Sequence, residues 1–248
     1  SVQILLEADR VGLQKYKAVI SSATKEKNTY NNVKNFAVEV IDQRKEIAII
    51  SDISHPDLGA LKRAIESNAQ RKVTLLKTNS ISDLKKYNLL IIYQPTASFR
   101  KVFDANKNLR INTFIITGMS TDFNLLNQMQ SDLEFKLTNK KEDFTSSFVT
   151  GFNLFAQNDI QFEQFPPLEN PFGKITEKGS LNTLLTAKVN GIEVGNPTLT
   201  FSEKGNSRSA YLLGENSWKW RMESHVINQS YEKYDQFIDK IIQYLSTN

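Results

Sequence analysis

Four short apolar runs constrain the fold of this chain more than any other feature. They are Glu46 to Ser51 (EIAIIS), Val73 to Leu76, Asn88 to Tyr93 and Asn112 to Thr117. Runs of this length without polar alternation are typical of parallel strands buried on both faces. Segments with helical spacing of apolar residues separate them. This order predicts an α/β fold, an open parallel sheet with helices on both faces, and the short connections favour the flavodoxin-like strand order 2-1-3-4.

Helix boundaries are also indicated by the sequence. After the first apolar run, Ser54 is a suitable N-cap, Pro56 suits the first turn, and Asp57 completes a capping box. A last helix is expected from about Tyr231 to Leu245, because five apolar residues there share one face.

The first 42 residues have a different pattern. Apolar residues stand two apart in three runs, which are Val2, Ile4 and Leu6, then Tyr16, Ala18 and Ile20, then Phe36, Val38 and Val40. Three antiparallel strands bury only one face, so they need a further sheet. We therefore expect residues 1–44 to be the terminal strands of a β-sandwich and residues 45–248 to be the α/β domain. The start at Ser1, without Met or a signal peptide, suggests a fragment of a longer protein.

Composition excludes several kinds of protein. The 248 residues are 40% hydrophobic and 23% charged, as in ordinary globular proteins. The absence of cysteine excludes disulfides, thiolate metal sites and a Cys nucleophile. The net charge of +4 comes from interspersed residues, so no nucleic-acid partner is expected. The longest apolar run, Leu89 to Tyr93, is much too short to cross a membrane.

A ligand of a doubly wound sheet binds at the carboxyl ends of its strands. The polar residues expected there are Asp52, His55, Gln94 and Ser120, which form our candidate ligand-binding rim. A metal or acid–base site at Asp52, His55 and Asp57 is one interpretation, and helix capping with a solvated loop is the favoured one. The loop after the first strand lacks the glycines of a phosphate cradle, and no cofactor is expected.

Two other functions use different residues. Ser120 follows a buried strand, where a serine hydrolase would carry its nucleophile, with His55 or His225 as the base. A helix cap is the favoured role of Ser120, because Asp122 replaces the second glycine of that motif. Trp218 and Trp220 would suit a carbohydrate-binding module if both indoles were exposed, and core packing is the favoured role of this pair.

Several segments support a family resemblance. They are Asn28 to Glu66, Tyr87 to Pro95, Phe165 to Gly173 and Gly214 to Arg221. Residues 31–42 resemble the closing strands of an immunoglobulin-like sandwich. Such a sandwich leads into an α/β domain in membrane-anchored Bacteroidetes proteins of the von Willebrand factor A-associated kind. The α/β part resembles the class I glutamine amidotransferase-like fold, which is itself flavodoxin-like.

The resemblance implies a function without catalysis. Amidotransferases use Cys, His and Glu, whereas this chain has no Cys and no late His-x-Glu. We therefore expect a non-enzymatic binding or scaffold domain of an exported, membrane-anchored bacterial protein. It would lie at the periplasmic face of the inner membrane. Its partners would be other domains of the same protein or periplasmic proteins.

Overall fold

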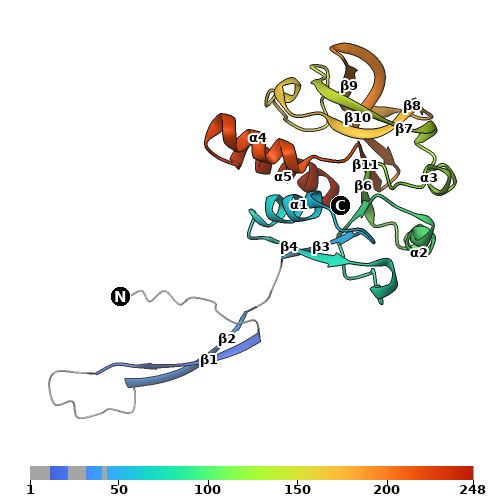
Figure 1. Ribbon diagram of the computed structural model, residues 1–248. Helices are drawn as coiled ribbons and strands as arrows, with labels where there is room; N and C mark the ends of the chain where they lie inside the picture. The colour runs from blue at the N-terminus through green and yellow to red at the C-terminus, as the bar shows by residue number, and fades with distance from the viewer. Residues whose placement is uncertain (1–11, 22–31, 41–43, 248) are drawn as a thin grey trace. The chain divides into compact units, whose positions relative to one another are not determined.

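The computed structural model describes residues 12–21, 32–40 and 44–247 (Figure 1). The chain divides into two compact units, residues 1–44 and 45–248. Each unit is described by itself below.

The first unit contains an antiparallel hairpin of β1 (Gly12–Val19) and β2 (Val33–Val40). Tyr16 lies opposite Phe36, and their rings stack with centroids 5.5 Å apart. The strands predicted around Tyr16 and Phe36 are therefore confirmed. The predicted strand from Val2 to Leu6 lies outside the described residues, as does nearly all of the turn that joins β1 to β2.

The second unit is built on one mixed sheet of nine strands in the order β4-β3-β5-β6-β11-β10-β9-β7-β8 (Figure 1). Its first five strands are parallel to one another. They are β3 (Lys45–Ile50), β4 (Arg71–Leu76), β5 (Leu89–Tyr93), β6 (Asn112–Thr117) and β11 (Ser207–Leu213). The four predicted apolar runs are thus strands, and their order β4-β3-β5-β6 is the predicted 2-1-3-4.

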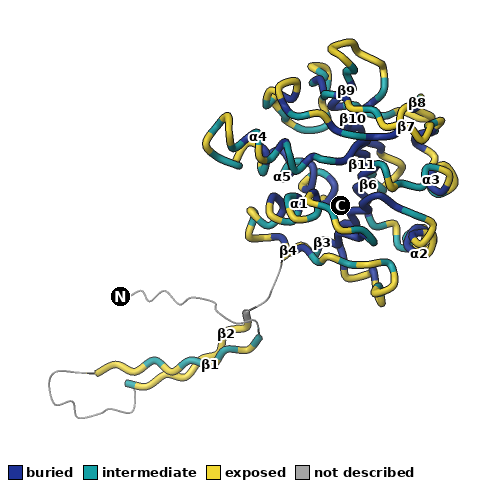
Figure 2. The backbone as a smooth tube through the Cα atoms, viewed as in Figure 1, coloured by how far each residue is buried: buried dark blue, intermediate teal, exposed yellow. Residues whose placement is uncertain are grey.

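Helices cover the parallel part of the sheet. Alternate residues of each strand join two separate cores, as Ile47 and Ile49 do on one face and Ala48 and Ile50 on the other. The first core includes α1 and α5, and the second includes α2 and α3. The central strands β5 and β6 are buried along their whole length, whereas β4 at the edge of the sheet is partly exposed (Figure 2). The helices are α1 (Pro56–Glu66), α2 (Arg100–Leu109), α3 (Phe123–Met129), α4 (Trp218–Asn228) and α5 (Glu232–Ser246).

The other part of the sheet is antiparallel and curls back on itself. Its strands are β7 (Leu133–Phe148), β8 (Leu168–Glu177), β9 (Leu181–Val189) and β10 (Ile192–Lys204). Glu169 of β8 exchanges two backbone hydrogen bonds with Glu215, which follows β11. Asn196 of β10 also bonds to the backbone of Gly173 and Ile175 in β8. The edge strand β8 therefore returns to the carboxyl end of β11.

The predicted flavodoxin-like, class I glutamine amidotransferase-like fold is wrong. Such a fold is a parallel sheet flanked by helices, whereas four of these nine strands run antiparallel beyond β11. After α3 the chain no longer alternates strands and helices, and it continues as the 16-residue strand β7. The centre of β7 is charged and exposed, so it lacks the apolar run by which the other strands were recognised.

Among the described residues, no helix is both long and apolar enough to cross a membrane.

Candidate functional site at the carboxyl ends of the parallel strands

The parallel strands bring several separated loops together. Because β3, β5, β6 and β11 are parallel neighbours, the residues that follow them gather at one edge of the sheet. Of the predicted rim residues, His55 and Gln94 contact Glu215 there, and the backbone N–H of Ser120 donates to Gln94. The fourth, Asp52, has separate partners. Sequence reasoning missed Glu215, and the only signal for it was its place two residues after the strand β11.

Gln94 occupies the strained turn at the end of β5. Its φ is 46°, in the left-handed region that non-glycine residues rarely adopt. The side chain is only 1% exposed. Its Nε2 donates to Glu215 Oε2 and to Tyr93 Oη (3.1 Å), and its Oε1 accepts from the backbone N–H of Ser120 at 2.8 Å. Gln94 is therefore held by three groups at this edge.

Gly118 makes room for this arrangement. A Cβ at this position would lie 2.5 Å from Gln94 Nε2 and 2.8 Å from Glu215 Oε2. The φ of Gly118 is not in the left-handed region, so the requirement for glycine is the close approach of these side chains.

Glu215 completes the set of acceptors around the loop after β6. Its Oε1 accepts from the backbone N–H of Met119 at 3.3 Å, while Gln94 Oε1 accepts from the backbone N–H of Ser120. The N–H of Gly118 donates to Thr121 Oγ1 at 2.9 Å. The loop's backbone donors are thus satisfied by the protein's own side chains.

Asp57 is a fully buried carboxylate that joins α1 to α4. Its Oδ1 accepts from the backbone N–H of Trp218 (2.7 Å) and from Ser217 Oγ (3.3 Å). Its Oδ2 accepts from Tyr93 Oη (2.8 Å) and from the N–H of Asn216 (2.9 Å). A negative charge at the start of a helix is favoured by the helix dipole, and Asp57 lies at two such starts. The predicted capping box with Ser54 is therefore wrong for Asp57.

His55, and not Ser54, is the N-cap of α1. Its Nδ1 accepts from the backbone N–H of Asp57 at 3.2 Å and lies 3.3 Å from Asp57 Oδ2, while its Nε2 lies 3.6 Å from Glu215 Oε2. Burial lowers the pKa of His55, but the hydrogen bond with Asp57 and the charges of Asp57, Glu215 and Glu169 outweigh it and raise the pKa above its ordinary value. Protonated His55 would donate to the Asp57 carboxylate, and neutral His55 caps the helix.

Asp52 links three loops at the other end of the rim. It accepts from the backbone N–H of Thr78 (2.9 Å), from Thr78 Oγ1 (2.8 Å) and from Ser98 Oγ (2.6 Å). Burial raises the pKa of Asp52, but the hydrogen bonds from Ser98 and Thr78 and the charge of Lys77 outweigh it, so the pKa lies below its ordinary value. This carboxylate is engaged in fixing the loops.

Ser120 is exposed and is neither a helix cap nor part of a visible catalytic pair. The N-cap of α3 is Asp122, whose side chain accepts from the N–H of Leu125. The imidazole of His55 faces Asp57 and Glu215, and that of His225 stacks on Tyr231 with centroids 4.3 Å apart. Within the described part of the chain, no hydrogen bond joins the hydroxyl of Ser120 to either imidazole.

The two indoles of α4 do not form an exposed pair. Trp220 is 1% exposed, donates from Nε1 to Pro166 O at 2.8 Å, and packs against Phe162 and Phe165. Trp218 is half-buried, and its Nε1 donates to Asn216. The platform that a carbohydrate-binding module would need from both rings is therefore not formed.

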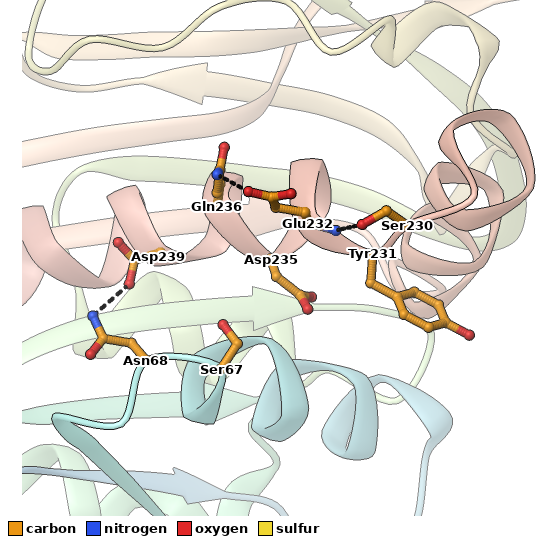
Figure 3. A pocket seen from close by; sticks show the side chains of 8 residues that line it. All are labelled: Ser67, Asn68, Ser230, Tyr231, Glu232, Asp235, Gln236 and Asp239. Atoms are coloured by element: carbon orange, nitrogen blue, oxygen red, sulfur yellow. Dashed lines mark hydrogen bonds between the residues drawn. The ribbon is translucent and has the colours of Figure 1, made fainter.

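A separate polar pocket lies between the end of α1 and the start of α5 (Figure 3). Its two most buried carboxylates already have cationic partners. Asp235 is held by Arg221 through two hydrogen bonds, and Asp239 lies 2.8 Å from Arg71. Among the described residues, no cluster of three or more His, Asp or Glu side chains is arranged as a metal site.

Comparisons with known proteins identify no family for this chain. No protein-family model matches it, and no curated protein matches it. One similar solved structure is the exo-β-1,4-mannosidase Op5Man5 from Opitutaceae bacterium strain TAV5, with 10% identity and a TM-score of 0.46 over 78% of this chain. Another is a β-galactosidase from the psychrophilic Marinomonas ef1, with 12% identity and a TM-score of 0.42 over 76% of this chain. This chain covers 35% and 30% of their lengths.

Proposed function

We propose that residues 45–248 form a non-catalytic binding or scaffold domain of an exported, membrane-anchored bacterial protein. The observation that carries the proposal is that the protein's own side chains accept the backbone N–H groups of the loop after β6. Gln94 and Glu215 accept the N–H groups of Ser120 and Met119. In a hydrolase of this kind, such N–H groups would have to be free to stabilise an oxyanion.

The residue at the strained turn supports the same conclusion. A nucleophile elbow places its nucleophile on a sharp turn between a strand and a helix. Here that turn carries Gln94, and a carboxamide is neither a nucleophile nor a general base. Gln94 donates to Glu215 and to Tyr93, and Tyr93 in turn donates to Asp57. The polar groups at this edge therefore stabilise the loops.

The partners that we propose are other domains of the same protein or periplasmic proteins. The rim offers them an outer surface, because Ser54, Pro56, Ser98 and Ser120 are exposed. The resemblance of residues 28–66 to the junction of a sandwich and an α/β domain supports a place at the periplasmic face of the inner membrane. On this proposal the hairpin of β1 and β2 belongs to an immunoglobulin-like sandwich.

An activity screen tests the absence of catalysis. Purified wild-type chain and the Ser120→Ala variant would be assayed with ester, amide and aryl-glycoside substrates over a range of pH. We expect both proteins to give the rate of buffer alone. Turnover by the wild type that disappears in Ser120→Ala would contradict the proposal and favour the serine hydrolase instead.

The cellular location needs its own test. An antibody raised against residues 45–248 would follow the native protein in spheroplasts treated with protease. We expect the antigen to be degraded without lysis and to sediment with membranes when protease is omitted. Protection from protease until the cells are lysed would contradict a periplasmic location.

A further inference from the structure

A second pocket lies between residues 157–161 and α5. Its volume is about 340 Å³, which is in the range of small-molecule sites. Its principal lining residues are Gln157, Ile160, Lys233, Gln236, Phe237 and Lys240. None of these residues belongs to the rim.

Two lysines give the pocket its charge. Lys233 and Lys240 are seven residues apart, so they lie on the same face of α5, about 10 Å apart along its axis. In the part of the chain that the structure describes, neither has an ion pair or a hydrogen bond from its ammonium group. Elsewhere on the molecule many lysines are paired, as Lys62 is with Glu66 and Lys188 with Glu163. The two ammonium groups therefore remain available to a ligand.

The single acid in the pocket is already engaged. Asp159 accepts at Oδ1 from the backbone N–H groups of Gln161 (2.9 Å) and Phe162 (3.1 Å). These bonds fix the loop, in which Gln161 adopts a φ of 72°. The pocket thus has two cations against one carboxylate, and its walls are held by backbone bonds.

Packing contacts with the core hold two of the residues that line the pocket in place. The ring of Phe237 packs on that of Phe162 with centroids 5.0 Å apart, and Ile160 packs against the main core. Gln157 donates from Nε2 to Asn158 O at 2.6 Å, but its Oε1 is buried without a donor among the described residues. This oxygen is out of reach of solvent, so it belongs to the packed wall and not to the surface that a ligand would contact.

We propose that this pocket binds a small organic anion that carries a carboxylate or a phosphate. The anionic group would lie between Lys233 and Lys240. This site is independent of the proposed absence of catalysis at the rim.

Calorimetric titration of the whole 248-residue chain tests the proposal. The probes are glucuronate for the carboxylate, glucose 6-phosphate for the phosphate, and neutral glucose. We expect saturable binding of at least one of the two anions, weakened by added salt, and much weaker binding of glucose. The anion that binds more tightly shows whether the pocket prefers a carboxylate or a phosphate. Equal binding of glucose, or no saturable binding of either anion, would overturn the proposal.

Matched variants locate the site. We expect Lys233→Gln combined with Lys240→Gln to weaken anion binding at least about tenfold, equivalent to about 1.4 kcal/mol. Lys101→Gln, which changes an exposed lysine on α2, should leave it unchanged. Thermal unfolding would confirm that each variant is folded. A double variant that is folded and binds like the wild type would exclude this pocket.

Discussion

The carboxylate of Asp57 accepts the backbone N–H of Trp218 at 2.7 Å, although 161 residues separate the two. This bond ties the first turn of α1 to the first turn of α4, and Asn216 and Ser217 donate to the same carboxylate. Tyr93 donates to it from the end of β5, between the two helices. One side chain therefore sets how the last part of the chain returns to the parallel strands.

Replacing Asp57 with Asn should be strongly destabilising. The amide keeps the size of the side chain but loses its charge and one of its acceptor oxygens, so at least one buried donor loses its partner. We expect the free energy of unfolding to fall by about 2–3 kcal/mol, measured by urea denaturation. Asp104→Asn, at an exposed position on α2, is the control and should change it by less than about 0.5 kcal/mol. Equal effects of the two substitutions would contradict the role of Asp57.

Two glycines should respond to alanine in opposite directions. At Gly118 the new Cβ would lie 2.6 Å from Gln94 Cδ, so Gly118→Ala should lower the free energy of unfolding by about 1–3 kcal/mol. At Gly59, inside α1, a Cβ meets nothing within 4 Å, so Gly59→Ala should raise it by up to about 1 kcal/mol. Chemical denaturation of both variants checks the pair. A harmless Gly118→Ala would show that the Gln94 and Glu215 side chains can move apart.

The sequence allowed the parallel half of the sheet to be predicted, because local patterns specify it. Runs such as Leu89 to Tyr93 are buried on both faces, and that burial leaves a continuous apolar stretch. In the antiparallel half, strands were predicted within β9 and β10, but their pairing into the same sheet was not. The length of β7 and the strand β8 were missed, since β8 contains Pro171 and Gly173 and the middle of β7 is charged. The closure of this half depends on the pairing of Glu169 with Glu215, which no local pattern records.

The candidate site was predicted only in part for the same reason. Strand ends indicated where His55, Gln94 and Ser120 would gather, and in the structure Gln94 joins Ser120 to Glu215, which His55 also faces. The roles of the side chains could not be predicted, because they depend on contacts between distant segments. Asp57 was expected to cap its own helix, yet its main partners are Tyr93 and residues 216–218.

The stability contributed by His55 should depend on pH. Its pKa is raised in the folded protein, so its contribution is fully present below its ordinary pKa of 6.5 and is lost as pH rises through the higher folded value. The difference in free energy of unfolding between wild type and His55→Gln should therefore be larger at pH 6 than at pH 9. Urea denaturation at both pH values measures it, with His225→Gln as the control. A difference that grows with pH would mean that neutral His55, as the N-cap, is the more stabilising form.

Exchanging Gln94 for Glu should place two carboxylates together. Gln94 Nε2 now donates to Glu215 Oε2, and a Glu at this position would present an oxygen there instead. Like charges at this distance cannot both ionise cheaply, so one pKa of the pair should rise above the unfolded value of about 4.3.

The folded Gln94→Glu variant would then bind more protons than the unfolded chain, and its stability should fall as pH rises. We expect a loss of about 2 kcal/mol near pH 7, partly recovered near pH 5, by urea denaturation at both pH values. Gln243→Glu, at an exposed position of α5, controls for the added charge. Gln94→Met, which removes the hydrogen bonds without adding charge, should lose stability by a similar amount at both pH values. Should Gln94→Glu follow the pH dependence of Gln94→Met, the two carboxylates do not meet, and Gln94 holds Glu215 less closely than the structure indicates.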